Sequence, residues 1–413
     1  MIIGLHMALI DLFLAARVQR GQLTVHHADG KTKTFGTPTP GFPEVTIRFT
    51  DKGAAAAILR DPGLGAGEAY MQGRLVVERG DVRDLVNLLT SNDPWEAGAN
   101  KLAASASRRA VEAVTHRIGR INMAKRSKRN VAHHYDLSDR LYDLFLDADR
   151  QYSCAYYTDP ANTLEQAQAD KKAHIAAKLA LKPGMKVLDI GCGWGGMALY
   201  LHAKTGAEVL GVTLSEEQLK VARRRAEEAG VADKVRFELI DYRHVTGTFD
   251  RIVSVGMFEH VGPAHYRTFF RQCRDLLTED GVMLLHTIGR AGGPGVTDRW
   301  TTKYIFPGGY NPALSEIVAA NEGLRFMVTD VEVLRLHYGY TLDAWYDRTV
   351  AARDAIVALY DAPFYRMWQF YLAGASAAFQ YGGLVNYQLQ FARNRHTLPI
   401  TRDYMIEGER ALR

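Results

Sequence analysis

The stretch from Val187 to Gly196, which reads VLDIGCGWGG, constrains the fold of this chain more than any other. An apolar strand ends at Asp189, a loop with four glycines follows, and a helix begins near Met197. Glycines let the backbone come close to a ligand, and the free amides at the start of a helix attract negative charge. The stretch therefore predicts a binding site for a small, partly charged molecule.

The glycine spacing alone does not identify the cofactor, because nicotinamide enzymes use the same spacing. Two details distinguish the possibilities. Asp189 lies two residues before Gly191, where its carboxylate can hold the amino acid end of S-adenosylmethionine. The next strand ends in Thr213 and Leu214, whereas a dinucleotide-binding fold offers an acidic residue to the ribose there. We therefore expect S-adenosylmethionine, with nicotinamide binding and a ligand-free turn as the alternatives.

Strands and helices alternate regularly around this loop. Strands are expected at 186–190, 208–212, 235–240, 251–255 and 282–287. Such alternation predicts the α/β class, with a doubly wound, mostly parallel, Rossmann-like sheet and right-handed crossovers. Because ligands bind beyond the carboxyl ends of parallel strands, one rim should carry Gly191, Gly193, Thr213, Asp241, Tyr242, Glu259, His286 and Ile288. A further strand is expected at 326–334, and helices from Leu342 to Arg393.

The chain has 413 residues, too many for one ordinary core, so we expect two domains. Residues 1–93 are interpreted as a small α+β domain for lipid binding or docking. It has a hairpin, a helix capped by Asp51 and ended by the string DPGLG, and a helix capped by Asp81. Residues 94–129 are interpreted as a basic helical connector. Residues 130–413 form the expected cofactor-binding domain, with a Gly- and Pro-rich lid and C-terminal helices.

Charge is unevenly distributed. The segment His116–Arg129 holds six Lys or Arg residues, and no acidic residue occurs between Glu112 and Asp136. An anionic partner is expected there, either phospholipid headgroups or nucleic acid, although a solvated linker explains the charge equally well. No run of about 18 uncharged apolar residues and no signal peptide is found. We expect a cytoplasmic protein without metal, because the cysteines lack metal-binding spacing: Cys154, Cys192 and Cys273.

Seven strings between Asn130 and about Arg393 resemble, in order, those of the cyclopropane-fatty-acyl-phospholipid synthases and the related mycolic acid cyclopropane synthases: QYSCAYY, VLDIGCGWGG, GVTLSEEQ, VGMFEHVG, LLHTIG, KYIFPGG and YTLDAW. The N-terminal string GEAYMQG resembles the extra domain of the phospholipid-acting branch. The resemblance implies transfer of a methylene from S-adenosylmethionine to cis double bonds of unsaturated phospholipid acyl chains, forming a cyclopropane ring. It implies peripheral association with the inner face of the membrane, and it is compatible with a homodimer.

The implied reaction leaves a carbocation that must lose a proton while bulk water is excluded. The family is understood to use a bound bicarbonate ion as the base, and the matching positions here are Cys154, Glu259, His286, Ile288 and Tyr338. Glu259 would accept the hydroxyl of the anion, and the carbonyl of Ile288 would also hold it. His286, Tyr338 and the Cys154 backbone amide would donate. For the cofactor, the resemblance and the loop together name Tyr135, Tyr152, Ser153, Asp189, Gly191, Gly193, Thr213, Leu214, Gln218 and Tyr242.

Each of these residues also has an ordinary structural interpretation. Glu259 could cap a helix, His286 could be a satisfied core histidine, and Cys154 could be a small buried hydrophobe. Tyr338 could be a packed aromatic residue, and Tyr242 could be a turn residue. Related enzymes whose product is a methyl-branched or methylene-bearing acyl chain, without a ring, remain alternatives. A nucleic-acid methyltransferase is disfavoured because no Asn/Asp-Pro-Pro-Tyr/Phe string and no RNA-binding signature occur. A lipid-transfer module would explain only the N-terminal domain.

Overall fold

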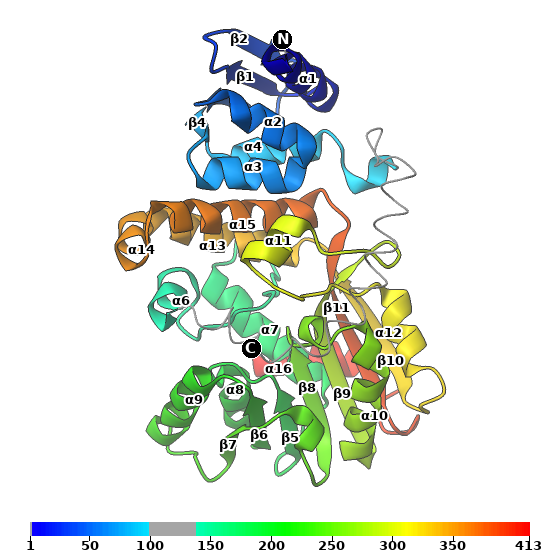
Figure 1. The fold of residues 1–413 in the computed structure, drawn as a ribbon. Coiled ribbons are helices and arrows are strands. Elements are labelled where there is room, and N and C mark those ends of the chain that lie inside the picture. Colours follow the sequence, from blue (N-terminus) through cyan, green and yellow to red (C-terminus); the bar gives the residue numbers. More distant parts are fainter. Residues whose placement is uncertain (1, 99–137) are drawn as a thin grey trace. The chain divides into compact units, whose positions relative to one another are not determined.

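The computed structural model describes residues 2–98 and 138–413 (Figure 1). Within them the chain forms two compact units. The first unit consists of residues 2–98, 298–307 and 342–383, and the second of residues 138–297, 308–341 and 384–413. Of the predicted connector, only residues 94–98 are described, with the short helix η1 (Trp95–Ala97); Tyr135 and the basic segment lie outside the described residues. None of the described helices is long and apolar enough to cross a bilayer.

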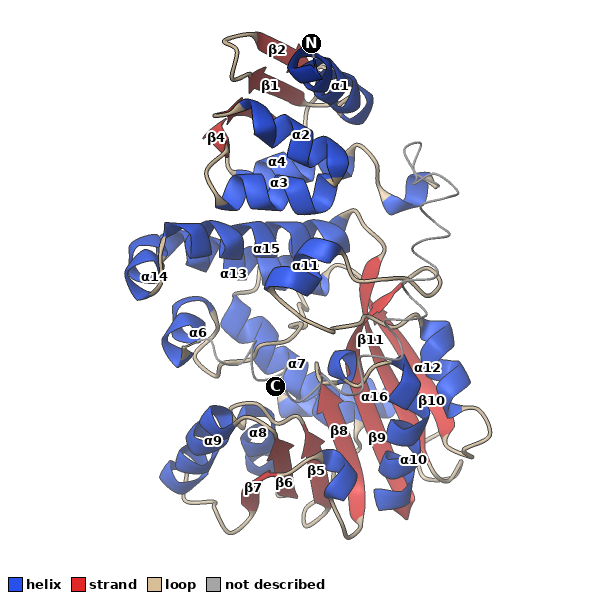
Figure 2. Ribbon diagram, viewed as in Figure 1, coloured by secondary structure: helices blue, strands red, loops and turns tan. Residues whose placement is uncertain are grey.

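The second unit contains a seven-stranded sheet in the order β10-β11-β9-β8-β5-β6-β7 (Figure 2). Its strands are β5 (Lys186–Ile190), β6 (Glu208–Thr213), β7 (Val235–Leu239), β8 (Phe249–Val255), β9 (Leu277–Arg290), β10 (Met327–Leu334) and β11 (Leu384–Ala392). The first five are mutually parallel, whereas β11 runs antiparallel to both β9 and β10. This sheet confirms the predicted doubly wound, mostly parallel fold.

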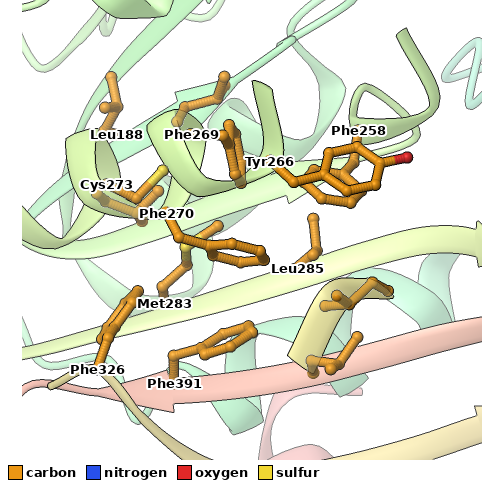
Figure 3. Close-up of a cluster of buried hydrophobic side chains, with 14 of the residues drawn as sticks. Leu188, Phe258, Tyr266, Phe269, Phe270, Cys273, Met283, Leu285, Phe326 and Phe391 are labelled. Atoms are coloured by element: carbon orange, nitrogen blue, oxygen red, sulfur yellow. The ribbon is translucent and has the colours of Figure 1, made fainter. Parts of the chain in front are cut away.

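Helices cover both faces of the sheet, so its central strands β5 and β8 are largely buried on both sides, whereas the edge strand β7 alternates between buried and exposed residues. The elements around it are α6 (Asp139–Phe145), α7 (Leu164–Lys178), α8 (Gly196–Thr205), α9 (Glu216–Glu228), α10 (Tyr266–Leu276), α12 (Leu314–Asn321) and α16 (Asp403–Leu412). One core joins α10 and α12 to the sheet and is rich in aromatic side chains, among them Phe258, Phe269, Phe270 and Phe391 (Figure 3). The other core joins α7, α8 and α9 to the opposite face.

The expectation of helix up to Arg393 is wrong from Leu384 onward, because residues Leu384–Ala392 form strand β11. This segment, LVNYQLQFA, is buried along nearly its whole length between β9 and β10. Pairing with one strand on each side satisfies its backbone hydrogen bonds. The pairing is non-local, and the aromatic composition of the region alone did not indicate it.

The first unit contains a four-stranded sheet in the order β2-β1-β3-β4. Its elements are α1 (Ile2–Arg17), β1 (Gln22–His26), β2 (Thr32–Phe35), β3 (Glu44–Phe49), α2 (Lys52–Arg60), α3 (Pro62–Met71), β4 (Leu75–Arg79) and α4 (Val82–Ser91). The predicted hairpin and the caps at Asp51 and Asp81 are confirmed. The string DPGLG ends α2 as expected but also starts α3, because Asp61 caps that helix and Pro62 suits its first position.

The first unit also includes α11 (Arg299–Tyr304), α14 (Arg353–Leu359), α15 (Ala362–Gln380) and most of α13 (His337–Ala351). The expectation that these segments belong to the cofactor-binding domain differs from what the structure shows. In the structure they pack with residues 2–98. The Tyr70 hydroxyl donates to Gln369 Oε1 at 3.2 Å, and Arg366 Nε donates to the Met71 carbonyl at 2.7 Å. These long-range contacts, invisible in local patterns, place the segments in the first unit.

Candidate active site

A pocket opens in the second unit beyond the carboxyl ends of β5, β6 and β8. Nine of the ten predicted cofactor residues line it: Tyr152, Ser153, Asp189, Gly191, Gly193, Thr213, Leu214, Gln218 and Tyr242. The tenth, Tyr135, lies outside the described residues. Segments far apart in the sequence meet here because parallel strands end at one edge of the sheet. The structure adds an aromatic wall, in which the Tyr142 ring packs edge-on against Tyr152 and Trp194 at centroid distances of 5.4 and 5.0 Å.

The glycine loop adopts the left-handed backbone that its sequence suggests. Gly191 has φ +83° and Gly193 has φ +54°. A Cβ atom on Gly191 would lie 2.9 Å from the Cβ of Met257, whereas one on Gly193 would meet nothing within 4 Å. Gly191 is therefore required both by its φ and by the close approach of the segment after β8, while Gly193 is required by its φ alone.

Asp189, at the end of β5, is almost fully buried, and its Oδ2 atom has no hydrogen-bond partner. Burial raises the pKa of this carboxyl to about 7. An unpaired acceptor facing a pocket is costly unless a donor arrives. The residue therefore suits the ammonium end of an amino acid ligand, whose charge would favour the ionised carboxylate.

Sequence reasoning missed Lys171 on α7. Its side chain is completely buried, and Nζ donates to Gln151 Oε1 at 2.7 Å and to Ser153 Oγ at 2.8 Å. Burial lowers the pKa of Lys171 to about 8. It thus anchors the loop that contributes Gln151, Tyr152 and Ser153 to the pocket. In the sequence, the polar residues of α7 are typical of the solvent-exposed face of an amphipathic helix, so no local signal indicated that Lys171 is buried.

On the other side of the pocket, short polar contacts order the ends of β6 and β7. Thr213 Oγ1 donates to Gln218 Oε1 at 3.2 Å and accepts from the Ser215 amide at 3.1 Å. Asp241 is held by the guanidinium of Arg243, with 2.9 Å between Nε and Oδ1. Burial of the Asp241 carboxyl opposes its ionisation, but these hydrogen bonds outweigh burial and lower its pKa.

Glu259 follows β8 in the short turn η3 (Phe258–His260). Its carboxylate does not serve as the N-cap of that turn; instead Oε1 accepts from the Ile288 amide on β9 at 2.6 Å. The Oε2 atom is buried without a partner, and burial raises the pKa of the carboxyl to about 7. The pocket is lined by the neighbouring residues Met257 and His260. The carboxylate therefore lies directly behind the pocket lining with one acceptor free.

The other predicted catalytic positions are also buried. His286 is flanked on β11 by Asn386, 3.0 Å from Nε2, and by Gln388, 3.1 Å from Nδ1. Burial holds the pKa of His286 well below its ordinary value, so the ring is neutral. Cys154 Sγ donates to the Ala155 carbonyl at 3.3 Å, and burial raises the pKa of this thiol, which favours a small-hydrophobe role for its side chain.

Tyr338 lies in the first turn of α13 and is 8% exposed. The loop after Cys154 is fastened to the same turn, since the amides of Ala155 and Tyr157 donate to Thr341 Oγ1 at 3.0 Å and to His337 Nδ1 at 2.9 Å. The Ile288 carbonyl accepts a hydrogen bond from Thr287 Oγ1 at 3.1 Å, and the Ile288 amide donates to Glu259. The five positions thus lie on segments next to the pocket, although none of them lines it.

Comparison with known proteins identifies the family. A family model described as mycolic acid cyclopropane synthetase matches residues 122–389. A cyclopropane-fatty-acyl-phospholipid synthase of Escherichia coli (strain K12) is 38% identical over 358 residues, which cover 87% of this chain and 90% of that protein. The chain belongs to the cyclopropane synthase family. It is therefore an S-adenosylmethionine-dependent methyltransferase.

Other similar proteins match about two thirds of the chain. Tuberculostearic acid methyltransferase UfaA1 of Mycobacterium tuberculosis is 39% identical over 282 residues, 65% of each chain. The crystal structure of mycolic acid cyclopropane synthase CmaA1 complexed with SAH and CTAB superposes with a TM-score of 0.61 at 35% identity, covering 64% of this chain and 98% of that one. Residues 13–95 match a separate model, described as a domain of unknown function.

Proposed function

We propose that this methyltransferase transfers a methylene group from S-adenosylmethionine to the cis double bond of unsaturated phospholipid acyl chains, forming a cyclopropane ring. The observation that carries the proposal is the buried Glu259, whose Oε1 is held by the Ile288 amide while Oε2 has no partner. A fixed acceptor in a buried site beside the cofactor pocket suits a reaction in which a base must be oriented without water. The E. coli relative, which covers both units, bears the name of this activity.

The pocket residues fit S-adenosylmethionine. The unpaired Oδ2 of Asp189 would accept a hydrogen bond from the amino group of the methionine end, and Gly191 and Gly193 would leave room for it. Thr213 and Gln218 would lie by the ribose, and Tyr242 would lie near the adenine. When bound, the cofactor supplies an electrophilic methyl group. The rings of Tyr152 and Trp194 offer π-faces that stabilise positive charge.

The residues behind the pocket suit bicarbonate as the base. Glu259 Oε2 would accept the hydroxyl of the anion, which avoids repulsion between two negative groups and makes the remaining oxygens more basic. Because burial raises the pKa of Glu259 to about 7, the carboxylate is a good acceptor above neutral pH. His286, Tyr338 and the Cys154 amide would donate to the anion, and the carbonyl of Ile288 would help to hold it. Burial of this cluster keeps water away from the proton that must leave.

A second product class has a specific observation in its favour, the 39% identity to a tuberculostearic acid methyltransferase. Methyl transfer to the double bond would be common to both reactions. They would differ in whether the resulting cation loses a proton from the new methyl group, which closes the ring, or follows another route to a methyl-branched or methylene chain.

Mass spectrometry of membrane lipids tests the proposal. The chain is expressed in a bacterial host that makes no cyclopropane lipids, beside a Glu259→Gln variant. We expect phospholipid acyl chains that gain one CH2 and resist catalytic hydrogenation, with far less product from the variant. A gain of CH2 in chains that are branched or take up hydrogen would favour the second product class. Unchanged lipids in a host that contains the folded enzyme would contradict both.

A further inference from the structure

A buried polar stripe on α7 is not used by the proposed reaction. Lys171, His174 and Lys178 follow one another at spacings of three and four residues, so they lie on one face of the helix. All three side chains are buried, and Lys178 is only 2% exposed. Lysine is almost never fully buried unless it is paired. The stripe therefore requires partners in the sheet on which α7 packs.

Those partners form a row across three neighbouring strands. Glu332 of β10 pairs in register with Gln388 of β11, and Gln388 pairs in register with His286 of β9. Lys178 forms an ion pair with Glu332, and its Nζ also donates to Gln388 Oε1 at 2.8 Å. Burial opposes ionisation of Glu332, but a 2.7 Å hydrogen bond with His174 and the charge of Lys178 lower its pKa to about 2. Glu332 is thus an anion that holds the ammonium of Lys178 against Gln388.

Lys178 decides which way the Gln388 amide faces. An ammonium group only donates, so the amide must present its oxygen to Lys178. Its NH2 group then faces His286 Nδ1 at 3.1 Å. Nδ1 must accept this hydrogen bond, and a neutral imidazole that accepts at one nitrogen carries its proton on the other. The proton of His286 is therefore on Nε2.

The orientation of Asn386 follows from the same argument. Its amide lies 3.0 Å from His286 Nε2, and two N–H donors cannot share one hydrogen bond. The amide oxygen of Asn386 must consequently face Nε2, an assignment that heavy-atom positions alone do not distinguish from the flipped one. The amide is thus an acceptor that holds the Nε2–H group in place.

We infer that Lys178 and Gln388 are positioning residues that hold His286 in its Nε2–H tautomer, so that the ring presents a donor at Nε2. The importance of this donor for turnover rests on the proposed function, in which the Nε2–H group would donate to the base in place of the Asn386 amide oxygen. The tautomer itself does not rest on it. In both hydrogen bonds, from Lys178 to Gln388 and from Gln388 to His286, the donor lies on the Lys178 side. The ion pair between Lys178 and Glu332 thus sets which nitrogen of His286 carries the proton.

Nitrogen-15 NMR of histidine-labelled full-length protein tests the tautomer directly. The His286 signals are identified by their absence in His286→Phe. We expect a protonated Nε2 and an unprotonated Nδ1 in the natural protein. In Gln388→Glu the new carboxylate can only accept, so Nδ1 should gain a proton. A natural protein with its proton on Nδ1, or a Gln388→Glu protein in which Nδ1 stays unprotonated, would overturn the inference.

Activity tests the positioning role, with a matched control on the same strand. Gln390 is also buried, donates to the Lys178 carbonyl and lies 2.8 Å from the Tyr404 hydroxyl, but it has no hydrogen bond to His286. We expect Gln388→Met to lower kcat at least tenfold with unchanged KM for S-adenosylmethionine, and Gln390→Met to lower only the melting temperature. Equal kcat values in folded samples of the two variants would remove the positioning role. Full activity of His286→Phe would instead contradict the use of His286 in the proposed function.

Discussion

Glu259 shows how burial gives a single side chain its chemical character. Its carboxyl is 7% exposed, one oxygen is bound by a backbone amide and the other is without a partner. An unsatisfied buried acceptor costs on the order of 1 to 3 kcal/mol of stability. A protein retains such a group where a ligand completes the hydrogen bonds. The same logic applies to Asp189 at the end of β5.

We predict that Glu259→Gln lowers turnover by more than a hundredfold, since loss of one transition-state interaction of about 3 kcal/mol has that effect. The amide donates where the proposed anion needs an acceptor. Affinity for S-adenosylmethionine, measured by calorimetry, should stay nearly constant because Glu259 does not line the cofactor pocket. A variant that melts earlier but turns over normally per folded molecule would show that Glu259 is only structural.

We predict that ionisation of the Glu259 carboxyl makes the free energy of unfolding depend on pH. Its pKa of about 7 in the folded protein lies above the ordinary value of 4.5, so the folded state holds the proton more tightly than the unfolded chain. Stability should therefore fall as pH rises from 4.5 to 7, by up to about 3 kcal/mol from this group, and level off above. Urea unfolding of natural protein and Glu259→Gln at pH 5 and pH 8 measures the difference. Parallel pH profiles would contradict it.

Gly191 and Gly193 provide a matched pair within one loop. Gly191→Ala should weaken S-adenosylmethionine binding strongly, because the new Cβ would displace Met257, which lines the pocket, and would adopt an unfavourable backbone angle. A Cβ on Gly193 would meet no protein atom within 4 Å, so Gly193→Ala should weaken binding less than Gly191→Ala, with about 1 kcal/mol of left-handed backbone strain. Calorimetric titration with the cofactor compares them. Equal affinities would show that the approach of Met257 is not limiting.

At the scale of elements, α7 connects the two parts of the site. Its polar stripe anchors the cofactor loop through Lys171 and the β9–β11 pair through Lys178. The opposite ends of these hydrogen bonds belong to segments that are far apart in the sequence. The buried polar face of α7 thus positions two groups of site residues. These contacts explain why α7 has buried lysines.

We predict that Lys171→Met weakens S-adenosylmethionine binding at least tenfold, because Ser153 and Gln151 lose their buried donor. The methionine side chain keeps the volume, so the helix itself should persist. Lys182→Met, at an exposed position beyond the end of α7, is the control for loss of a lysine. Fluorescence or calorimetric titration gives the affinities. If both variants bind like the natural protein, the loop is held by other contacts.

At the scale of the whole molecule, the described residues form two units and the basic segment lies outside them. A substrate inside a bilayer requires the enzyme to reach the membrane surface. The predicted site of attachment is the cluster from Arg117 to Arg129, whose charge favours anionic headgroups. Peripheral membrane association and a homodimer remain predictions from the sequence.

Replacing Lys125, Arg126, Lys128 and Arg129 by Gln should weaken binding to anionic vesicles by roughly 1 kcal/mol per residue, with less effect as salt rises. Sedimentation with vesicles of phosphatidylglycerol, beside neutral phosphatidylcholine vesicles, measures this. Cofactor affinity should not change in the variant. If vesicle binding changes neither with the substitutions nor with salt, the segment acts only as a linker.

The sequence by itself determined the central sheet and nine of the residues that line the pocket beyond the ends of β5, β6 and β8. The central strands β5, β8 and β9 are largely buried on both faces, so each contains a short apolar run, a pattern that can be recognised locally. Residues that directly follow such strands must meet at one edge of the sheet. The pocket positions from Asp189 to Tyr242 could therefore be named before any coordinates were known, and the family strings added the residues behind them.

Only the tertiary structure decided which distant segments become partners. Leu384–Ala392 is a strand because β9 and β10 pair with it on both sides, and the helices from Leu342 onward pack with the N-terminal residues. The roles of Lys171, Lys178 and Gln388 follow from contacts over 18 to 210 residues of chain. The role of a buried polar side chain depends on the group with which it forms a hydrogen bond or an ion pair. That group is brought near by folding and not by sequence spacing.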